Sequence, residues 1–372
     1  MKGPNYIALA VPFFFLLIGL ELLAARARGR RVYRLADAVA DLGCGIVQQV
    51  VVAFAGAALL AAYAAVHDRF HLLDLSAASA WGWLAAFVGV DLGYYWWHRL
   101  SHRVNVLWAV HVVHHQSEDY NLAVALRQAI LSGFTSLPFY LPLALLGVPP
   151  LAYATMLSLS TLYQFWIHTE LVGKLGRAEA VLNTPSHHRV HHAVNARYLD
   201  RNYGATFIVW DRLFGTFAEE REPAVFGTVK PLGSFNPIWA QVQYWVELWR
   251  RARSLPRWPD RVKVWLMPPD WKPAGAAWPE PPVEGRTKHE APAGRGGRLY
   301  AGLQLVPVVA ATFALMMWGA AMPRATALLL AGLIVWSLAS LGGLLDGRPW
   351  ARPLEAGRLV AVVAAALAVS VA

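Results

Sequence analysis

The chain has 372 residues, of which 57% are hydrophobic and 15% charged, and it contains 17 tryptophans. This composition excludes an ordinary soluble protein of two domains and indicates an integral membrane protein. The net charge of +10 does not indicate a nucleic-acid partner, because the arginines lie beside apolar segments. That arrangement is typical of cytoplasmic flanks that face anionic lipid.

Residues 1–77 are predicted to hold two transmembrane helices. The apolar run at residues 7–25 is long enough to span a bilayer and lacks a convincing cleavage signature, so we interpret it as a retained helix. Five arginines follow within residues 26–34, which places that loop in the cytoplasm. A second helix is expected at about residues 41–66, and the connection at residues 67–76 is expected on the opposite side.

Residues 78–237 carry the motifs that indicate chemistry. A third helix, at about residues 78–97, is expected to return to the cytoplasm and to end at His98 and His102. Asp91 lies two turns before His98 in an apolar helix. A buried carboxylate of this kind usually has a partner. It therefore either supports a ligand histidine or makes a structural polar contact.

A helical hairpin is predicted next, with helices at about residues 130–146 and 151–167 around Gly147–Pro150. It returns to the same membrane face at His168. Two interpretations of His168 stay open at this point, a further metal ligand and a hydrogen-bonded interfacial residue.

Nine of the 13 histidines fall in two stretches, residues 91–115 and 183–192, with the spacings H-x3-H, H-x2-H-H and again H-x2-H-H. On a helix, residues at i, i+3 and i+4 share one face, so each group can direct its imidazoles at a common point. Eight imidazoles are too many for one ion and indicate a binuclear metal site. Iron is the expected metal, because two ferrous ions can supply electrons to split O2, whereas catalytic zinc usually takes three protein ligands.

The remaining chain is divided into two parts. Residues 238–298 are predicted to form a cytoplasmic amphipathic helix, at about residues 238–255, and an extended linker. Residues 299–372 are predicted to hold C-terminal transmembrane helices at residues 300–320 and 325–345, and an apolar segment of marginal length at residues 359–372. The predicted fold is thus an all-α, polytopic integral membrane protein with a histidine-rich di-metal site at its cytoplasmic face.

These motifs resemble the fatty acid hydroxylase/sterol desaturase superfamily over roughly residues 78–237. Within it, the stretches at residues 91–99, 114–121, 125–128, 166–170 and 183–192 are most similar to the alkylglycerol monooxygenases. The resemblance implies a catalytic set of eight metal ligands: His98, His102, His111, His114, His115, His188, His191 and His192. Asp91, Glu118, Asp119, Asn183 and His187 are expected around the metals, with a surface position also open for His187, and His168 is an open ninth ligand.

The resemblance also implies a membrane-bound, O2-dependent monooxygenase with two iron ions and a lipid substrate, such as the ether bond of alkylglycerols. An external reductant is then required, either tetrahydrobiopterin or a protein donor. One departure is Arg103, which stands where these monooxygenases usually have Glu, and Glu118 or Asp119 is expected to supply the missing carboxylate. The Ala- and Arg-rich composition favours a bacterial inner membrane.

Two other functions stay open at this point. One is a desaturase or sterol C-methyl oxidase with the same metal centre. The other is a catalytically silent membrane metal-binding protein, since arginine cannot coordinate a metal. Transport is disfavoured, because the histidines lie at helix ends rather than at the bilayer midplane.

Overall fold

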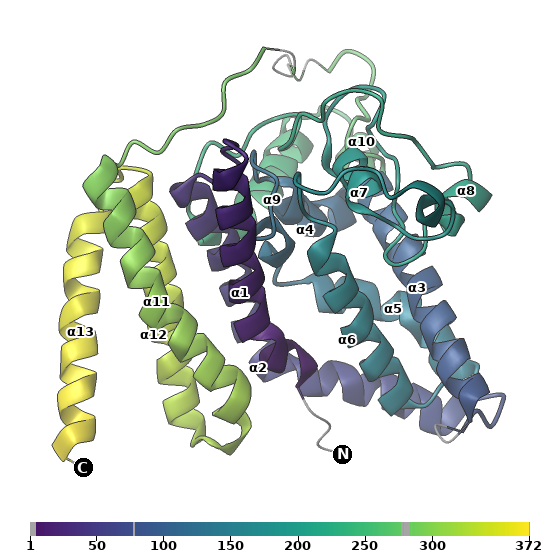
Figure 1. Ribbon diagram of the computed structural model, residues 1–372, viewed down its shortest axis with the longest axis horizontal. Helices are drawn as coiled ribbons and strands as arrows, with labels where there is room; N and C mark the ends of the chain where they lie inside the picture. Colours follow the sequence, from purple (N-terminus) through teal and green to yellow (C-terminus); the bar gives the residue numbers. More distant parts are fainter. Residues whose placement is uncertain (1–4, 77–78, 277, 279–282, 284, 372) are drawn as a thin grey trace.

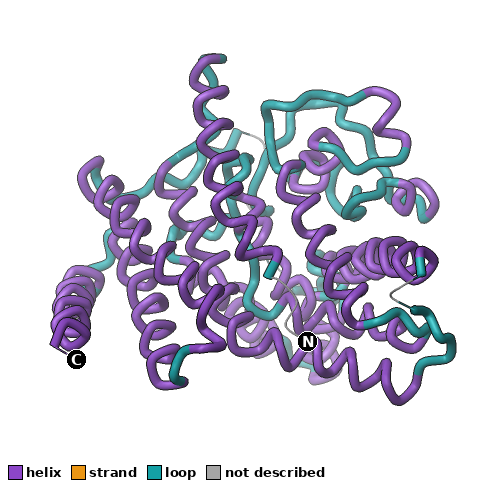
Figure 2. Tube along the Cα trace, turned by 60° about the horizontal axis from the view of Figure 1, so that its bottom comes forward, coloured by secondary structure: helices purple, strands orange, loops and turns teal. Residues whose placement is uncertain are grey.

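The computed structural model describes residues 5–76, 79–276, 278, 283 and 285–371, with side chains described up to residue 364. The predicted boundary between residues 77 and 78 and the predicted end at residue 372 lie outside these residues. Within them the chain is helix and loop with no strand (Figure 2), and only two isolated bridges pair extended residues. The all-α prediction is confirmed.

The α-helices follow the order α1 (Tyr6–Ala27), α2 (Leu35–Phe70), α3 (Ala80–Arg103), α4 (Asn105–His115), α5 (Ser132–Leu145), α6 (Pro150–Trp166), α7 (Pro185–His192), α8 (Val209–Leu213), α9 (Pro237–Ser254), α10 (Trp258–Leu266), α11 (Arg295–Trp318), α12 (Arg324–Leu345) and α13 (Ala351–Val371). Among the described residues, four helices are long and apolar enough to cross a membrane, namely α1, α2, α11 with the turn that extends it, and α12. The chain is therefore a multi-pass membrane protein.

The α5–α6 hairpin forms where the sequence predicts it, but its helices are short. With 14 and 17 residues, both fall below the roughly 20 residues that span a bilayer. They pack against α2 and α3 instead. The turn requires glycine, because Gly147 has a φ of +90° and a Cβ there would lie 1.8 Å from the carbonyl oxygen of Leu73.

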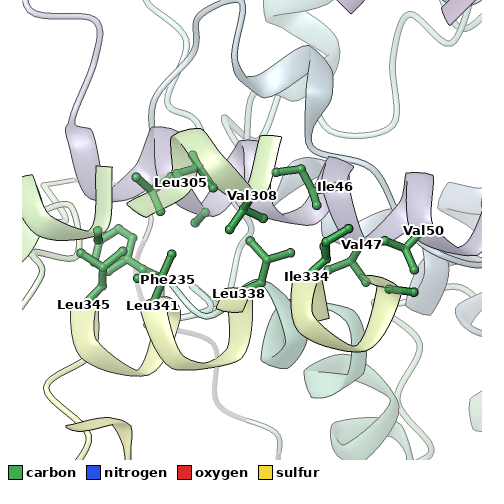
Figure 3. Close-up of a cluster of buried hydrophobic side chains, with 14 of the residues drawn as sticks. Ile46, Val47, Val50, Phe235, Leu305, Val308, Ile334, Leu338, Leu341 and Leu345 are labelled. Carbon is green, nitrogen blue, oxygen red and sulfur yellow. The ribbon is translucent and has the colours of Figure 1, made fainter. Parts of the chain in front are cut away.

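The largest apolar cluster joins the N-terminal and C-terminal helices. Figure 3 shows Ile46 of α2 near Val308 of α11 and Leu338 of α12, and Val50 of α2 near Ile334 of α12. Because lipid tails are as apolar as these side chains, close packing rather than exclusion of water holds such helices together. The C-terminal helices are thus packed onto the same α2 that runs beneath the histidine-bearing segments.

The segment predicted as an extended linker is partly helical and is anchored to the rest of the chain. It contains α10, which packs on α9 through Val264. Further on, the Arg286 guanidinium donates to two carbonyl oxygens at 2.7 Å, and the Lys288 ammonium lies 2.7 Å from Asp119 Oδ1. The pattern of Pro, Gly and Arg did not indicate these contacts, because each partner is distant in sequence.

Loops and short helices gather at one end of the long helices, and the start of α1 and the end of α13 lie at the other (Figure 1). The arginine-rich loop after α1 lies at the same end as the histidines. Arg28 donates to the Leu171 carbonyl oxygen at 2.8 Å, and Arg30 pairs with Glu170 at 2.8 Å, both just after His168. These contacts place the arginine loop and the histidines on one side of the helical layer.

Candidate metal centre and lipid cavity

The structure gathers nine buried histidines into two groups. In each group the candidate ligand atoms all lie within 4.8 Å of one another. We call them the first cluster (His98, His102, His111, His115 and His191) and the second cluster (His114, His168, His188 and His192). All eight histidines that the sequence predicts as ligands belong to one of the two, and His168 joins the second. Their role as ligands remains a prediction.

The repeated H-x2-H-H spacing explains how α4 and α7 serve both clusters. On α4, His111 and His115 are four residues apart and share one face, and both belong to the first cluster. His114 differs in direction from its neighbour His115 by about 100° around the helix, and it belongs to the second. On α7 the division is reversed, because His188 and His192 belong to the second cluster and His191 to the first.

Backbone carbonyl oxygens fix the orientation of four of these rings. The Nδ1 atom of His98 lies 2.8 Å from the Tyr203 oxygen, and that of His191 lies 2.9 Å from the Arg201 oxygen. In the second cluster, His114 Nδ1 lies 2.9 Å from the Arg127 oxygen and His168 Nδ1 lies 2.7 Å from the Gln164 oxygen. A carbonyl oxygen only accepts, so each Nδ1 carries the proton and each Nε2 keeps a lone pair for a metal.

The Nε2 lone pairs face one another, as ligands around a cation do. His114 and His168 both carry their proton on Nδ1, yet their Nε2 atoms are 3.2 Å apart. Two acceptors at that distance repel unless a cation lies between them. Nitrogens roughly 2.1 Å from one ion and at right angles to each other would be about 3 Å apart. Each cluster therefore fits a metal ion.

Unpaired ring nitrogens and lowered pKa values also support a metal ion in each cluster. The Nε2 atoms of His98, His102 and His191 are buried and have no hydrogen-bond partner among the described residues. Burial, reinforced by neighbouring histidines, lowers the pKa of His188, His191 and His192 well below its usual value. These rings are consequently neutral at physiological pH, which is the form that binds metals.

Asp91 holds the loop that orients His98 of the first cluster. Its carboxylate accepts from the backbone N–H groups of Thr206 and Phe207 at 2.7 and 3.2 Å, and from Trp210 Nε1 at 2.8 Å. The loop that it holds includes the Tyr203 carbonyl oxygen that orients His98. Of the two interpretations that the sequence left open for Asp91, the structure shows the structural polar contact.

Asp211 and Asn183 hold the same loop from its other side. The Asp211 carboxylate accepts from the N–H groups of Tyr203 and Gly204, each at 2.8 Å. The Asn183 side-chain amide donates to the Gly204 oxygen at 2.6 Å. The sequence predicts Asn183 near the site but assigns no role to Asp211.

Asp200 is a site residue that the sequence analysis missed. It adopts a left-handed backbone with a φ of +60°, and its Oδ1 lies 3.6 Å from His102 Nδ1. Arg103 binds its other oxygen at 2.7 Å. The carboxylate beside His102 is thus supplied by Asp200, and the unusual Arg103 is its partner. In the sequence, the indication of Asp200 was Arg103 itself, because an arginine at a position where glutamate is expected suggests a carboxylate partner nearby.

Glu118 and Asp119 have other partners than the sequence analysis expected. Asp119 accepts from the Arg34 backbone N–H at 2.9 Å and from Lys288, and Glu118 accepts from the His289 N–H at 2.6 Å. They bind the arginine-rich loop and residues 288–289 beside the site, and they do not supply the carboxylate at His102. His187 lies outside both clusters, with its ring edge against Phe217 at a centroid distance of 5.4 Å.

A buried ion pair supports the second cluster and was also missed. Arg127 donates to Asp41 Oδ1 at 3.1 Å and to the Val113 oxygen at 2.6 Å, and both charged side chains are almost fully buried. The carbonyl oxygen of Arg127 in turn orients His114. The pair thus ties α2 to the segment that positions a cluster histidine.

A mainly apolar cavity of about 520 Å³ reaches both clusters. Its walls come from α1, α2, α5, α6 and α11, with side chains such as Phe14, Ile46 and Leu137. His111 of the first cluster and His114 and His168 of the second line it. A concave apolar cavity of this size with a few convergent polar groups is typical of a small-molecule site. Its position among membrane helices suits a lipid chain.

Comparison with known proteins agrees with this site. The fatty acid hydroxylase family model matches residues 83–216, which contain both clusters. Human alkylglycerol monooxygenase is 39% identical over 361 residues, covering 95% of this chain and 80% of that protein. The chain belongs to the alkylglycerol monooxygenase family. The zebrafish (Danio rerio) family member is also 39% identical, with coverage of 97% and 82%.

More distant relatives match a smaller part of the chain. An ornithine lipid hydroxylase of Rhizobium tropici is 27% identical over 135 residues, which is 36% of this chain and 41% of that protein. No solved structure matches the chain. As a member of the alkylglycerol monooxygenase family with a fatty acid hydroxylase region, the protein is a membrane oxidoreductase, a monooxygenase that acts on lipid.

Proposed function

We propose that the protein is a di-iron, O2-dependent monooxygenase that oxidises the ether bond of alkylglycerols. The observation that carries the metal assignment is the pair of acceptor nitrogens on His114 and His168, which face each other at 3.2 Å. The family membership supports the ether lipid as substrate. All-histidine donor sets of this kind suit a non-haem metal pair.

The histidines of the first cluster would hold one iron ion and those of the second cluster the other. Bound iron would supply the activation of O2, which no protein side chain can provide. His98, His114, His168 and His191 are held by backbone carbonyl oxygens, so their lone pairs point into the clusters before any ion arrives. Such pre-orientation removes the cost of ordering the ligands on binding.

The cavity would place the alkyl chain and keep water away from the reacting carbon. Phe14, Phe165 and Leu126 line it near the second cluster and have no polar side-chain atoms. One oxygen atom enters the C–H bond beside the ether oxygen, and the other leaves as water with two protons and two electrons from an external reductant. The resulting hemiacetal breaks into a fatty aldehyde and glycerol.

The orientation in the membrane is part of the same proposal. The arginine-rich loop contacts the residues that follow His168, and by the positive-inside rule this supports clusters at the cytoplasmic face. There, tetrahydrobiopterin or a protein donor could deliver electrons. A bacterial inner membrane stays a prediction from composition, while the human and zebrafish relatives that match most of the chain are from animals.

The experiment is metal analysis of the protein purified in detergent, together with its turnover of 1-O-hexadecylglycerol. We expect close to two iron atoms per chain, and release of hexadecanal only when O2 and a reductant are both present. A metal-free protein would contradict the catalytic assignment. Full iron content without aldehyde, but with a desaturated or hydroxylated lipid or sterol, would assign the same metal centre to the other reactions of the superfamily.

A further inference from the structure

The cavity beside the clusters is lined by uncharged side chains apart from its histidines. Among the described residues that line it there is no Asp, Glu, Lys or Arg, yet four glutamines interrupt its apolar walls: Gln48, Gln49, Gln128 and Gln164. A polar group in such a wall is costly unless it has a hydrogen-bond partner. This lining fits a ligand that has polar groups and no charge.

Two of these glutamines flank the second cluster. Gln164 precedes His168 by about one helical turn, and its carbonyl oxygen accepts from His168 Nδ1 at 2.7 Å. Gln128 directly follows Arg127, whose carbonyl oxygen accepts from His114 Nδ1 at 2.9 Å. Both glutamines line the same cavity as these two histidines. They therefore belong to the part of the wall where a lipid would meet the metals.

Both amides are held in the same way by the backbone. Gln164 Nε2 donates to the Ser160 oxygen at 3.2 Å, and Gln128 Nε2 donates to the Ala125 oxygen at 3.0 Å. One hydrogen of each amino group is thereby engaged, and each side chain also has its Oε1 atom as an acceptor. An acceptor binds a hydroxyl hydrogen, whereas an ionised phosphate or carboxylate offers only further acceptors.

We propose that Gln128 and Gln164 determine head-group specificity by accepting hydrogen bonds from the free hydroxyls of the glycerol head. The inference rests on the proposed function, because the hydroxyls lie only a few bonds from the ether carbon that must reach the metals. Lipids with the same alkyl chain and a phosphorylated head are then rejected, since no lysine or arginine lines the cavity to pair with the phosphate.

The test compares 1-O-hexadecylglycerol with its 3-phosphate on the iron-loaded enzyme in lipid nanodiscs. We expect the wild type to prefer the uncharged lipid. Gln128→Leu and Gln164→Leu should each raise KM for that lipid about tenfold with little change in kcat, since one hydrogen bond is lost. Iron content should stay unchanged. Gln243→Leu on α9 is the matched control, because Gln243 lies outside the cavity lining.

Gln128→Lys tests the same position in the opposite direction. The lysine ammonium should pair with the phosphate and lower KM for the 3-phosphate lipid. Equal kcat/KM of the wild type on both lipids, or leucine variants with full iron and an unchanged KM, would overturn the inference and leave the proposed function standing. A wild type that is loaded with iron and turns over neither lipid would overturn the proposed function, and this inference with it.

Discussion

The two histidine clusters draw on the same two helices but have different surroundings. The second cluster is completed by His168, and two of its members line the lipid cavity. The first cluster is completed by His98 and His102 of α3, contributes only His111 to the cavity, and has a carboxylate beside it. That carboxylate belongs to Asp200, whose partner Arg103 has a side chain 48% exposed to solvent.

The difference indicates that the two proposed metal positions would not be equivalent. A lipid chain in the cavity would approach the second cluster, while the first cluster lies towards the polar surface at Arg103. The helices α4 and α7 couple the two, since each supplies histidines to both. A substitution in one cluster should thus remove the metal of that cluster and leave the metal of the other in place.

The largest expected effect comes from His188→Ala and His191→Ala, three residues apart on α7. Each should abolish turnover, but the first should empty the second cluster and the other should empty the first, leaving about one metal of two. His114→Ala and His111→Ala should divide in the same way on α4. The measurement is the number of metal ions per chain by mass spectrometry. His67→Ala, at a histidine outside both clusters, is the control and should bind as much metal as the wild type. Loss of both metals from every variant would contradict separable clusters.

His168→Ala decides whether the ninth histidine belongs to the metal site. Its Nε2 lies 3.0 Å from His188 Nε2 and 3.2 Å from His114 Nε2. We expect the variant to lose the second-cluster metal and all turnover. A variant that keeps both metals, with kcat/KM within a few-fold of the wild type, would make His168 an interfacial residue that only packs against the site.

Much of this arrangement could be predicted because it is local in sequence. Helix α9 follows from amphipathic periodicity and begins within one residue of its predicted start, and the division of H-x2-H-H follows from helical geometry. What could not be predicted depends on distant partners. Arg127 meets Asp41 across 86 residues, and Arg103 meets Asp200 across 97. No local pattern identifies such pairs.

The conformation of the loop at residues 200–204 also could not be predicted from the sequence. The carbonyl oxygens that orient His98 and His191 belong to residues 200–204, where two non-glycine residues have positive φ. Sequence preferences do not indicate that such a loop will run beside a metal site. Its conformation follows from two carboxylates. Asp211 accepts from the N–H groups of Tyr203 and Gly204, and Asp91 accepts from three N–H groups just beyond, within residues 206–210.

Arg127→Met should cause a smaller effect, on stability first. Removing one member of a buried ion pair leaves Asp41 without its partner, which typically costs about 3 kcal/mol or more. We expect a clear fall in the unfolding temperature in detergent, together with weaker metal retention in the second cluster, next to His114. The double variant Arg127→Met/Asp41→Leu should recover much of the stability. An unchanged unfolding temperature in the single variant would show that the pair is not stabilising.

The smallest effect is expected at Asp200, and it tests the first cluster alone. Carboxylates that support a metal-bound histidine typically contribute about 10- to 100-fold in metal affinity. Asp200→Asn should thus weaken the first-cluster metal by that factor and leave the second at wild-type affinity, as measured by competition with a chelator. Glu219→Gln, an exposed carboxylate paired with Lys174, is the matched control.

Arg103 supplies the decisive variant in this last comparison. Arg103→Gln should weaken the same metal less than Asp200→Asn, because the carboxylate stays beside His102 and loses only its partner. If Arg103→Gln weakens it more, the arginine itself orients the first cluster. If Asp200→Asn leaves both metals at wild-type affinity, Asp200 serves only to shape the loop at residues 200–204. In the expected case, this chain holds a carboxylate at His102 through an arginine that cannot itself bind metal.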